Sequence, residues 1–148
     1  MEIKTQEFRN EKDIPRVHTC DGSDRVPTIQ IRDIPPKTRA LALIIDDPDA
    51  TGGGVWDHCV LYNIPAETKE IHAKNIDTFQ SGVNSWGKER YGGPCPPRGD
   101  RPHRYYFKLY ALDSELEFKK PPNTEQLTKA MKRHILKEAS CMGVYSRK

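Results

Sequence analysis

The chain has 148 residues and a formal net charge of +3, from 24 lysine and arginine and 21 aspartate and glutamate residues. This balance excludes a general nucleic-acid binder, since no basic stretch is interleaved with aromatic residues. The mean hydropathy of −0.80 is low, but the apolar residues are gathered in short runs that a disordered chain of this polarity does not hold. We therefore expect one globular domain that spans residues 1–148.

The beginning of the chain carries no sign of a targeting segment. Met1–Glu7 has no apolar region, and no segment approaches the roughly 18 apolar residues of a membrane span. The four cysteines, at positions 20, 59, 95 and 141, are widely spaced and form no C-x-x-C pair. The absence of an apolar targeting or membrane-spanning segment predicts a cytoplasmic protein without stable membrane insertion. Four free thiols are the default expectation, and one or two disulfides are the alternative.

Four short runs in the first part of the chain predict β-strands. Thr28–Ile31 alternates, Leu41–Ile45 is continuously apolar, Val55–Ile64 is aromatic and β-branched, and Arg104–Leu112 is aromatic. Prolines and glycines separate these runs, and no alternating strand–helix rhythm is present. Short strands at irregular spacing favour an antiparallel sandwich or barrel, so the chain is predicted to be mainly β.

The last part of the chain predicts a helix, because residues 123–139 contain no proline or glycine. Their apolar residues recur at helical spacing, at Leu127, Ala130, Met131, Ile135 and Ala139. Asn123 or Thr124 can cap the helix, and Gln126 stands three residues after Asn123, as in a capping box. We expect one C-terminal amphipathic helix across the β fold, followed by a short final segment that contains Tyr145.

Three carboxylates follow the predicted strand Leu41–Ile45. Asp46, Asp47 and Asp49 surround Pro48. An Asp-Pro-Asp sequence makes a good turn by itself, because aspartate bonds the local backbone and proline fixes φ. A turn without function and a functional site both remain open. The buried strand shifts the balance towards function, because it brings the turn to the edge of the core.

Further polar residues stand where other predicted strands begin. His58 opens one strand, although a lone histidine on a strand is more often a satisfied, half-buried residue than a catalytic one. His103 and Tyr105 share one strand face, because adjacent strand residues point to opposite faces, and they can therefore line one pocket. Arg104 lies on the other face and is expected to clamp a carboxylate beneath the pocket.

A loop rich in glycine and proline, residues 91–100, leads into the strand that carries His103. Gly92, Gly93 and Gly99 permit close approach and positive φ, so their N–H groups could form an anion nest; a rigid turn is the alternative. The loop lacks G-x-x-x-x-G-K-[ST], which excludes a nucleotide P-loop.

Cys95 could be a nucleophile, but a proline-flanked loop does not reliably lower a thiol pKa. Two histidines with an aspartate could form a metal site, which no spacing supports.

Several motifs follow one another along the chain: Ile14-Pro15, Thr19–Gly22, Asp47–Ala50, Trp56–His58, Asn84–Gly87, Tyr91–Pro97 and Gly99–Tyr105. In this order they resemble the phosphatidylethanolamine-binding protein family, and within it the short prokaryotic branch related to Raf kinase inhibitor protein. The resemblance runs from Phe8 to Tyr145. It implies two antiparallel β-sheets with Greek-key connections, a β-sandwich, plus a C-terminal α-helix.

The resemblance also implies a small anion-binding cavity at one end of the fold. Its predicted lining is Asp47, Asp49, His58, Pro96, Pro97, His103 and Tyr105. Tyr145 is expected to close the cavity. Two departures from the family pattern stand out. Thr51 replaces the usual proline and is followed by Gly52–Gly54, which predicts a more flexible rim, and the long C-terminal extension of animal members is absent.

Together these features predict a non-enzymatic binding and regulatory protein that needs no cofactor and no metal. Its ligand would be a small anion: phosphate, a phosphate ester such as phosphoethanolamine, or a carboxylate. Asp47 and Asp49 would hold His58 or His103 in its charged donor form, or would meet an ammonium group of the ligand. The family resemblance adds inhibition of a protein kinase or a serine protease.

Other functions remain as alternatives. The chain could be a small hydrolase that uses Cys95 or a histidine-activated water, or a stable scaffold with a vestigial pocket. Aromatic residues such as Trp86 and Tyr91 could meet a second copy of the chain, which would give a homodimer.

Overall fold

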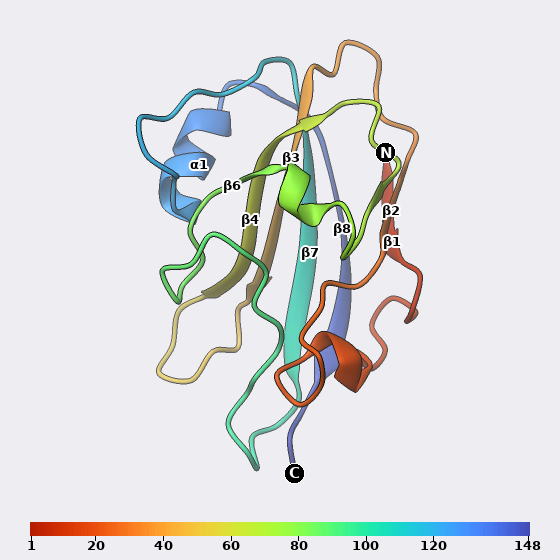
Figure 1. Ribbon diagram of the computed structural model, residues 1–148, viewed down its shortest axis with the longest axis vertical. Coiled ribbons are helices and arrows are strands. Elements are labelled where there is room, and N and C mark those ends of the chain that lie inside the picture. Colours follow the sequence, from red (N-terminus) through yellow and green to blue (C-terminus); the bar gives the residue numbers. More distant parts are fainter.

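Two antiparallel β-sheets frame the computed structural model, which describes residues 1–148 (Figure 1). The larger sheet has five strands in the order β6 (Gln80–Ser81), β4 (Trp56–Pro65), β3 (Ala40–Asp47), β7 (His103–Leu112) and β8 (Ile135–Tyr145). The smaller sheet contains β1 (Glu2–Thr5), β2 (Ile29–Arg32) and β5 (Glu70–Ile71). The helical elements are α1 (Thr124–Met131) and two 3-10 turns, η1 (Arg16–His18) and η2 (Ile76–Thr78). The predicted mainly β architecture with two antiparallel sheets and one helix is confirmed.

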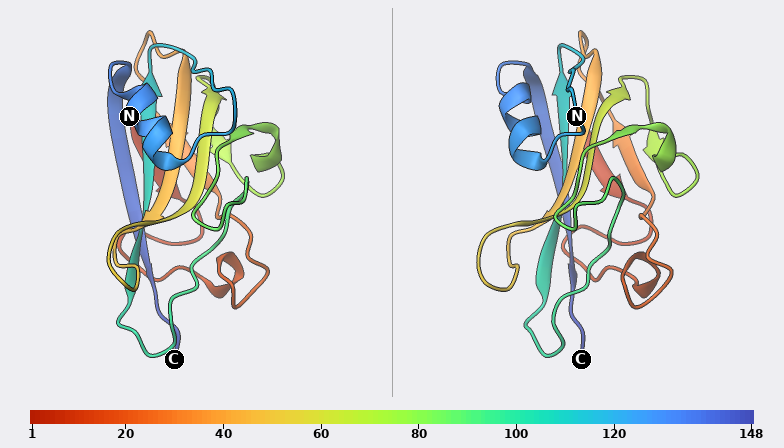
Figure 2. Two further views of the ribbon diagram at one scale, coloured as in Figure 1. Left: turned by 90° about the vertical axis from the view of Figure 1, so that its left-hand side faces the viewer. Right: turned by 60° about the vertical axis from the view of Figure 1, so that its left-hand side comes forward.

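Strand β3 lies at the centre of the larger sheet, and all eight of its residues are buried. Leu43 and Ile45 face the smaller sheet and pack in its core, whereas Ala42 and Ile44 face α1. The two further views show this layering, with α1 on one side of the larger sheet and β1 and β2 on the other (Figure 2). A strand covered on both faces has no polar side, which explains the continuous apolar run that predicted it.

Helix α1 begins as the sequence predicts. The backbone N–H of Gln126 donates to Asn123 Oδ1 at 2.8 Å, and the N–H of Asn123 donates to Gln126 Oε1 at 3.0 Å, so the capping box is complete. Leu127 and Met131 point into the core. The helix ends at Met131, however, and the predicted extension to Ala139 is wrong.

The segment after α1 is β8, an eleven-residue strand at the edge of the larger sheet, rather than a helix end with a short tail. It pairs with β7 along its length, from Leu112 opposite Ile135 to His103 opposite Tyr145. This long ladder outweighs the local preference for helix. The inward residues of β8 near its end are small, and a Cβ on Gly143 would come within 2.5 Å of an Ile14 side-chain atom.

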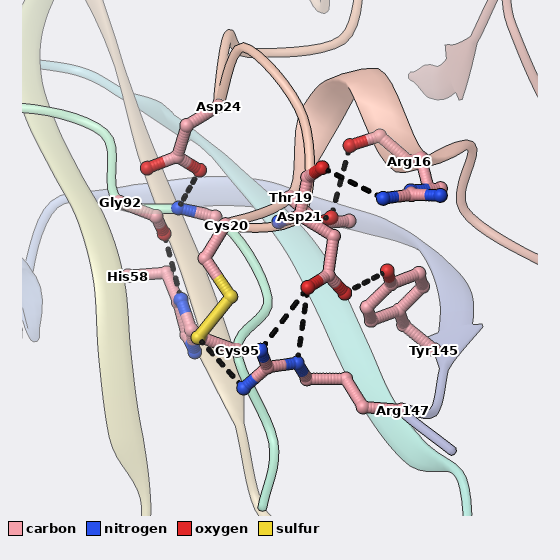
Figure 3. The surroundings of a disulfide bond; sticks show 11 residues. Arg16, Thr19, Cys20, Asp21, Asp24, His58, Gly92, Cys95, Tyr145 and Arg147 are labelled. Atoms are coloured by element: carbon pink, nitrogen blue, oxygen red, sulfur yellow. Dashed lines mark hydrogen bonds and ion pairs between the residues drawn. A yellow bond between two sulfur atoms is a disulfide. The ribbon is translucent and has the colours of Figure 1, made fainter. Parts of the chain in front are cut away.

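A disulfide joins Cys20 to Cys95, while Cys59 and Cys141 are free and buried (Figure 3). The default expectation of four free thiols is therefore wrong. The spacing of 75 residues gave no sign of this bond, which exists because the fold lays two loops side by side, with the Cys20 N–H donating to the Pro94 carbonyl at 3.1 Å. Disulfides are rare in the reducing cytosol, so this bond does not support the expected cytoplasmic location. No helix of the structure has the length and apolar character to cross a membrane.

Candidate functional site

The loops that carry the predicted site residues gather at one end of the molecule, the lower end in Figure 1. They enclose a pocket of about 320 Å³. Its lining consists of Asp47, Ala50, Thr51, Trp56, His58, Trp86, Cys95, Pro96, Pro97, His103 and Tyr105. Six of the seven predicted ligand residues are in this set. Asp49 is the exception, and it lies outside the pocket.

His103 and Asp47 form a buried pair in the pocket. Asp47 ends β3, His103 begins β7, and His103 Nδ1 lies 2.7 Å from Asp47 Oδ2. Both side chains are about 95 % buried, with 6 % and 5 % of their surfaces exposed. Burial by itself lowers the pKa of His103, but hydrogen bonds to Asp47 and to Asp100 act in the opposite direction and raise the pKa above its usual value. The pocket thus holds an imidazole that favours its charged form.

A second carboxylate, Asp100, reaches the other nitrogen of the same ring. His103 Nε2 lies 3.0 Å from Asp100 Oδ2, which also accepts a hydrogen bond from Thr51 Oγ1 at 3.2 Å. Asp100 was not among the site residues predicted from the sequence. Its position three residues before His103 was the available signal, but the turn that brings the two together is set by the loop.

His58 has the opposite electrostatic character. Its Nδ1 donates to the Gly92 carbonyl at 2.7 Å, because a carbonyl only accepts. Burial lowers the pKa of His58, so the ring is neutral near pH 7 and its Nε2 is an acceptor. The ring contacts Tyr105 and Trp86 edge-on, with ring centroids 5.2 Å and 5.1 Å apart.

Asp49 is held by Arg104 on the opposite face of β7. The guanidinium donates from Nε and Nη2 to the two carboxylate oxygens, each at 2.9 Å, and the Arg104 backbone N–H adds a third bond at 2.9 Å. The side-chain hydrogen bond from Arg104 is the main reason why the pKa of Asp49 falls to about 2. The expected role of Arg104 as a carboxylate clamp is confirmed, and its partner is one of the residues predicted to line the pocket.

The glycine loop supplies packing rather than an anion nest. The N–H groups of Gly92, Gly93 and Gly99 donate to the His58 carbonyl, to Asp24 Oδ1 and to the Arg147 carbonyl. A nest needs N–H groups that are free for a ligand, so for these three glycines the structure agrees with the alternative of a rigid turn. The predicted close approach to a glycine does occur at Gly92, because a Cβ there would come within 2.4 Å of the Trp86 ring. Of these three glycines, Gly99 alone has positive φ, at 87°.

Two tryptophans form the rim of the pocket, although neither was predicted there from the sequence. Trp56 and Trp86 meet edge-to-face with ring centroids 5.5 Å apart, and they are 37 % and 44 % exposed. Tyr91, which was grouped with Trp86 as an exposed residue, points inward instead, and its hydroxyl donates to the His18 carbonyl at 2.6 Å. Of the two aromatic residues proposed for a homodimer surface, only Trp86 is exposed.

Cys95 and Tyr145 do not have the roles that the sequence suggested for them. The Cys95 sulfur is bonded to Cys20, so it is no thiolate nucleophile. Tyr145 is absent from the pocket lining, and its hydroxyl donates to Asp21 instead. Arg147 also binds Asp21, at 3.1 Å, and places a nitrogen 3.5 Å from the Cys95 sulfur (Figure 3). These contacts brace the outer side of the pocket wall.

A metal centre and a second groove are poorer candidates for ligand chemistry. No three histidine, cysteine or carboxylate side chains are gathered so that they could hold a metal ion, so the two-histidine, one-aspartate alternative has no counterpart. A larger groove of about 1400 Å³ lies beside α1, and its lining includes Tyr62 and Phe118. Its lining contains no histidine. The pocket around His103 is the better candidate for ligand chemistry.

The chain matches a known protein family along almost its whole length. The sequence profile described as phosphatidylethanolamine-binding protein matches residues 4–146. A UPF0098 protein of Aquifex aeolicus is 40 % identical, over 99 % of this chain and 89 % of that protein. A UPF0098 protein of Methanothermobacter thermautotrophicus is 39 % identical, over 99 % of both chains.

Solved structures give the same assignment. The Chlamydia trachomatis protein CT736, described as a homologue of phosphatidylethanolamine-binding protein, superposes with a TM-score of 0.93 at 34 % identity, over 99 % of this chain and 97 % of that one. Escherichia coli YbcL, described as a member of the mammalian family, gives a TM-score of 0.90 at 25 % identity, over 99 % and 98 % of the two chains. The chain therefore belongs to the phosphatidylethanolamine-binding protein family.

Proposed function

We propose that the chain is a non-enzymatic binding and regulatory protein whose pocket takes a small anion, either a phosphate or phosphate-ester head group or a carboxylate. The observation that carries this proposal is the buried pair of His103 and Asp47 in a pocket of about 320 Å³. A charged imidazole is the natural partner of an anion in a water-poor site. This volume lies near the lower end of the usual range for ligand pockets, which fits a small head group.

Asp47 does not oppose this role, because its charge is already matched. Its Oδ2 faces His103 at 2.7 Å, and its Oδ1 accepts the Asp49 backbone N–H at 2.7 Å. The carboxylate fixes the ring orientation and keeps the imidazole protonated. The neutral His58 adds an acceptor for a protonated phosphate oxygen.

The rim supports a ligand with an apolar part beyond its head group. Trp56 and Trp86 expose ring surface at the mouth, and Pro96 and Pro97 form part of the wall. Aromatic and proline surfaces of this kind favour apolar or cationic groups that lie next to a polar head.

Titration with phosphate, phosphoethanolamine and acetate tests the proposal, by calorimetry or by NMR of the histidine rings. We expect saturable binding to the parent chain and a loss of at least about tenfold in affinity for His103→Ala, the size of one charge-assisted contact. His134→Ala is the matched control, because His134 also pairs with a carboxylate, Asp113, but does so away from the pocket. No saturable binding to the parent, or equal binding to His103→Ala, would refute the anion pocket.

Inhibition of a kinase or a serine protease stays a prediction for this chain. A carboxypeptidase Y inhibitor, solved with its cognate proteinase, superposes with a TM-score of 0.59 at 18 % identity, over 99 % of this chain and 82 % of that one. At this identity the likeness concerns the fold alone. Inhibition assays against a panel of serine proteases and kinases would test both roles independently of the pocket.

A further inference from the structure

The strongest unassigned feature of the molecule is the carboxylate of Asp100, which is not part of the pocket lining but binds the ring of His103, the charged donor of the pocket. His103 has two ring nitrogens, and each faces a carboxylate oxygen, Asp47 at 2.7 Å and Asp100 at 3.0 Å. Carboxylates only accept, so the charged ring donates both of its protons within the protein. An incoming anion can therefore bind His103 only if one of these two carboxylates leaves.

The two carboxylates differ in how firmly they are held. Asp47 is buried, with 5 % of its side chain exposed, and its second oxygen accepts a backbone N–H. The Asp100 side chain is 38 % exposed, and its further bond is to the Thr51 hydroxyl at 3.2 Å. Ion pairs that reach solvent contribute little to stability, whereas a buried partner is costly to remove. Asp100 is therefore the carboxylate that a ligand can displace.

The surroundings of Asp100 leave room for that movement. Gly99, next to it, has a φ of 87° and nothing within 4 Å of where a Cβ would stand. Thr51, its partner across the mouth, is followed by three glycines of positive φ that are equally open on the Cβ side. Both partners of this hydrogen bond, Asp100 and Thr51, therefore lie on segments with few packing constraints.

We propose that Asp100 is a specificity-determining residue, an internal anion that occupies His103 Nε2 and must be displaced by any anionic ligand. This inference rests on the proposed anion pocket. Asp100 weakens the binding of simple anions, because the ligand must compete with a tethered carboxylate and then sit beside its charge. The binding of a zwitterion is weakened less, because its cationic group can pair with the displaced carboxylate.

The experiment compares the parent chain with Asp100→Asn, which removes the charge and keeps the shape. Phosphate and phosphoethanolamine are titrated at about pH 6, where the raised pKa of His103 keeps the ring charged. We expect phosphate to bind Asp100→Asn about tenfold more tightly than the parent, with a smaller gain for phosphoethanolamine. Asp113→Asn is the matched control, because it removes an equal charge from an aspartate–histidine pair just beyond the opposite end of β7.

A second measurement follows the internal pair without any ligand. The pKa of His103, measured by NMR, should fall in Asp100→Asn and stay unchanged in Asp113→Asn. The other groups near the ring are retained in both variants: Asp47 from β3, the stacked Tyr105 and the cross-strand Tyr145. This measurement shows whether the contact exists in solution, whatever the ligand does.

The outcomes separate the two proposals. Equal or weaker phosphate binding to Asp100→Asn would overturn the inference about Asp100 while leaving the anion pocket in place. Equal gains for phosphate and phosphoethanolamine would overturn the selectivity for zwitterions. If the His103 signals respond to Asp100→Asn but no chain binds phosphate, the anion pocket itself is refuted.

Discussion

His103 and His58 face the same pocket, yet their surroundings drive them towards opposite charge states. Carboxylates on both sides raise the pKa of His103, although burial opposes them, whereas burial lowers the pKa of His58. Neighbouring titratable groups with pKa values pushed apart mark a site with divided roles. Here the division is between a charged donor and a neutral acceptor.

The affinity for acetate should fall as the pH rises from about 6 to 9, because His103 loses its proton as the pH passes its raised pKa. Burial lowers the pKa of His58, so this ring loses its charge before His103 does as the pH rises. Acetate keeps its charge throughout, since carboxyl groups titrate near about pH 4. Calorimetric titrations across the range would measure the decline. A constant affinity would show that the imidazolium does not bind the anion.

Substitution of the two aspartates of the Asp-Pro-Asp turn should have different effects on the affinity for phosphate. Asp47→Asn should weaken phosphate binding by about tenfold or more, because His103 loses its buried charged partner. Asp49→Asn should change the affinity by less than about twofold, since Asp49 pairs with Arg104 outside the pocket and its charge is partly screened. A large effect of Asp49→Asn would restore this residue to the site as the sequence predicted.

Strands β3 and β8 show at the level of elements which parts of a sequence reveal their structure. The apolar run Leu41–Ile45 predicted β3, because burial on both faces excludes polar residues. In β8 the inward positions near the end are Cys141 and Gly143, so the alternation that identifies a half-buried strand is faint. The pairing with β7 decides its structure, and pairing between distant segments leaves no local pattern.

The same distinction applies to the pocket. Motif resemblance gave six of its lining residues, because these residues belong to the recurring motifs. Trp56, Trp86 and Asp100 stand in the same motifs, but the resemblance gave them no role. Nothing in the local sequence shows that the two tryptophan rings line the pocket or that a turn places Asp100 against His103. The Cys20–Cys95 bond was missed for a related reason, because widely spaced cysteines carry no information about which loops meet.

Gly143→Ala should destabilise the fold by about 1–3 kcal/mol, the usual cost of overpacking a core. The added methyl would lie 2.5 Å from atoms of Ile14 and Phe8, which anchor the N-terminal segment to β8. Urea unfolding would measure the loss. Ser140→Ala, at an exposed position of the same strand, is the control and should change the free energy of unfolding by less than about 0.5 kcal/mol. Equal stability of the two variants would contradict the tight packing at Gly143.

At the scale of the whole molecule, the disulfide ties an N-terminal loop to the wall of the pocket. Cys20 and Cys95 lie 75 residues apart, and Arg147, next to the C-terminal residue, contacts the Cys95 sulfur (Figure 3). Segments from the beginning, middle and end of the chain therefore converge on one side of the site. The wall that carries Pro96 and Pro97 depends on all of them.

Reduction of this bond should lower the free energy of unfolding by about 2–4 kcal/mol, because the unfolded chain regains the freedom that the cross-link removes. Denaturant unfolding with and without reductant would measure the change. The double variant Cys20→Ser with Cys95→Ser should be insensitive to reductant. Thiol counting in denaturant should find two reactive thiols before reduction and four afterwards, matching the free Cys59 and Cys141. Four thiols before reduction would show that the bond is absent.

The central pairing of β3 with β7 also has a kinetic consequence. Ala40 pairs with Leu112 and Asp46 with Tyr106, so the middle of the larger sheet forms only after a long stretch of chain has closed on itself. Topologies dominated by such distant contacts fold slowly, in about milliseconds to seconds. Asp47 and His103 stand at the ends of these two strands and meet only when that step is complete. A nascent chain that has not yet produced β7 therefore has no binding site, and a ligand that recognises this pair distinguishes finished molecules from unfinished ones.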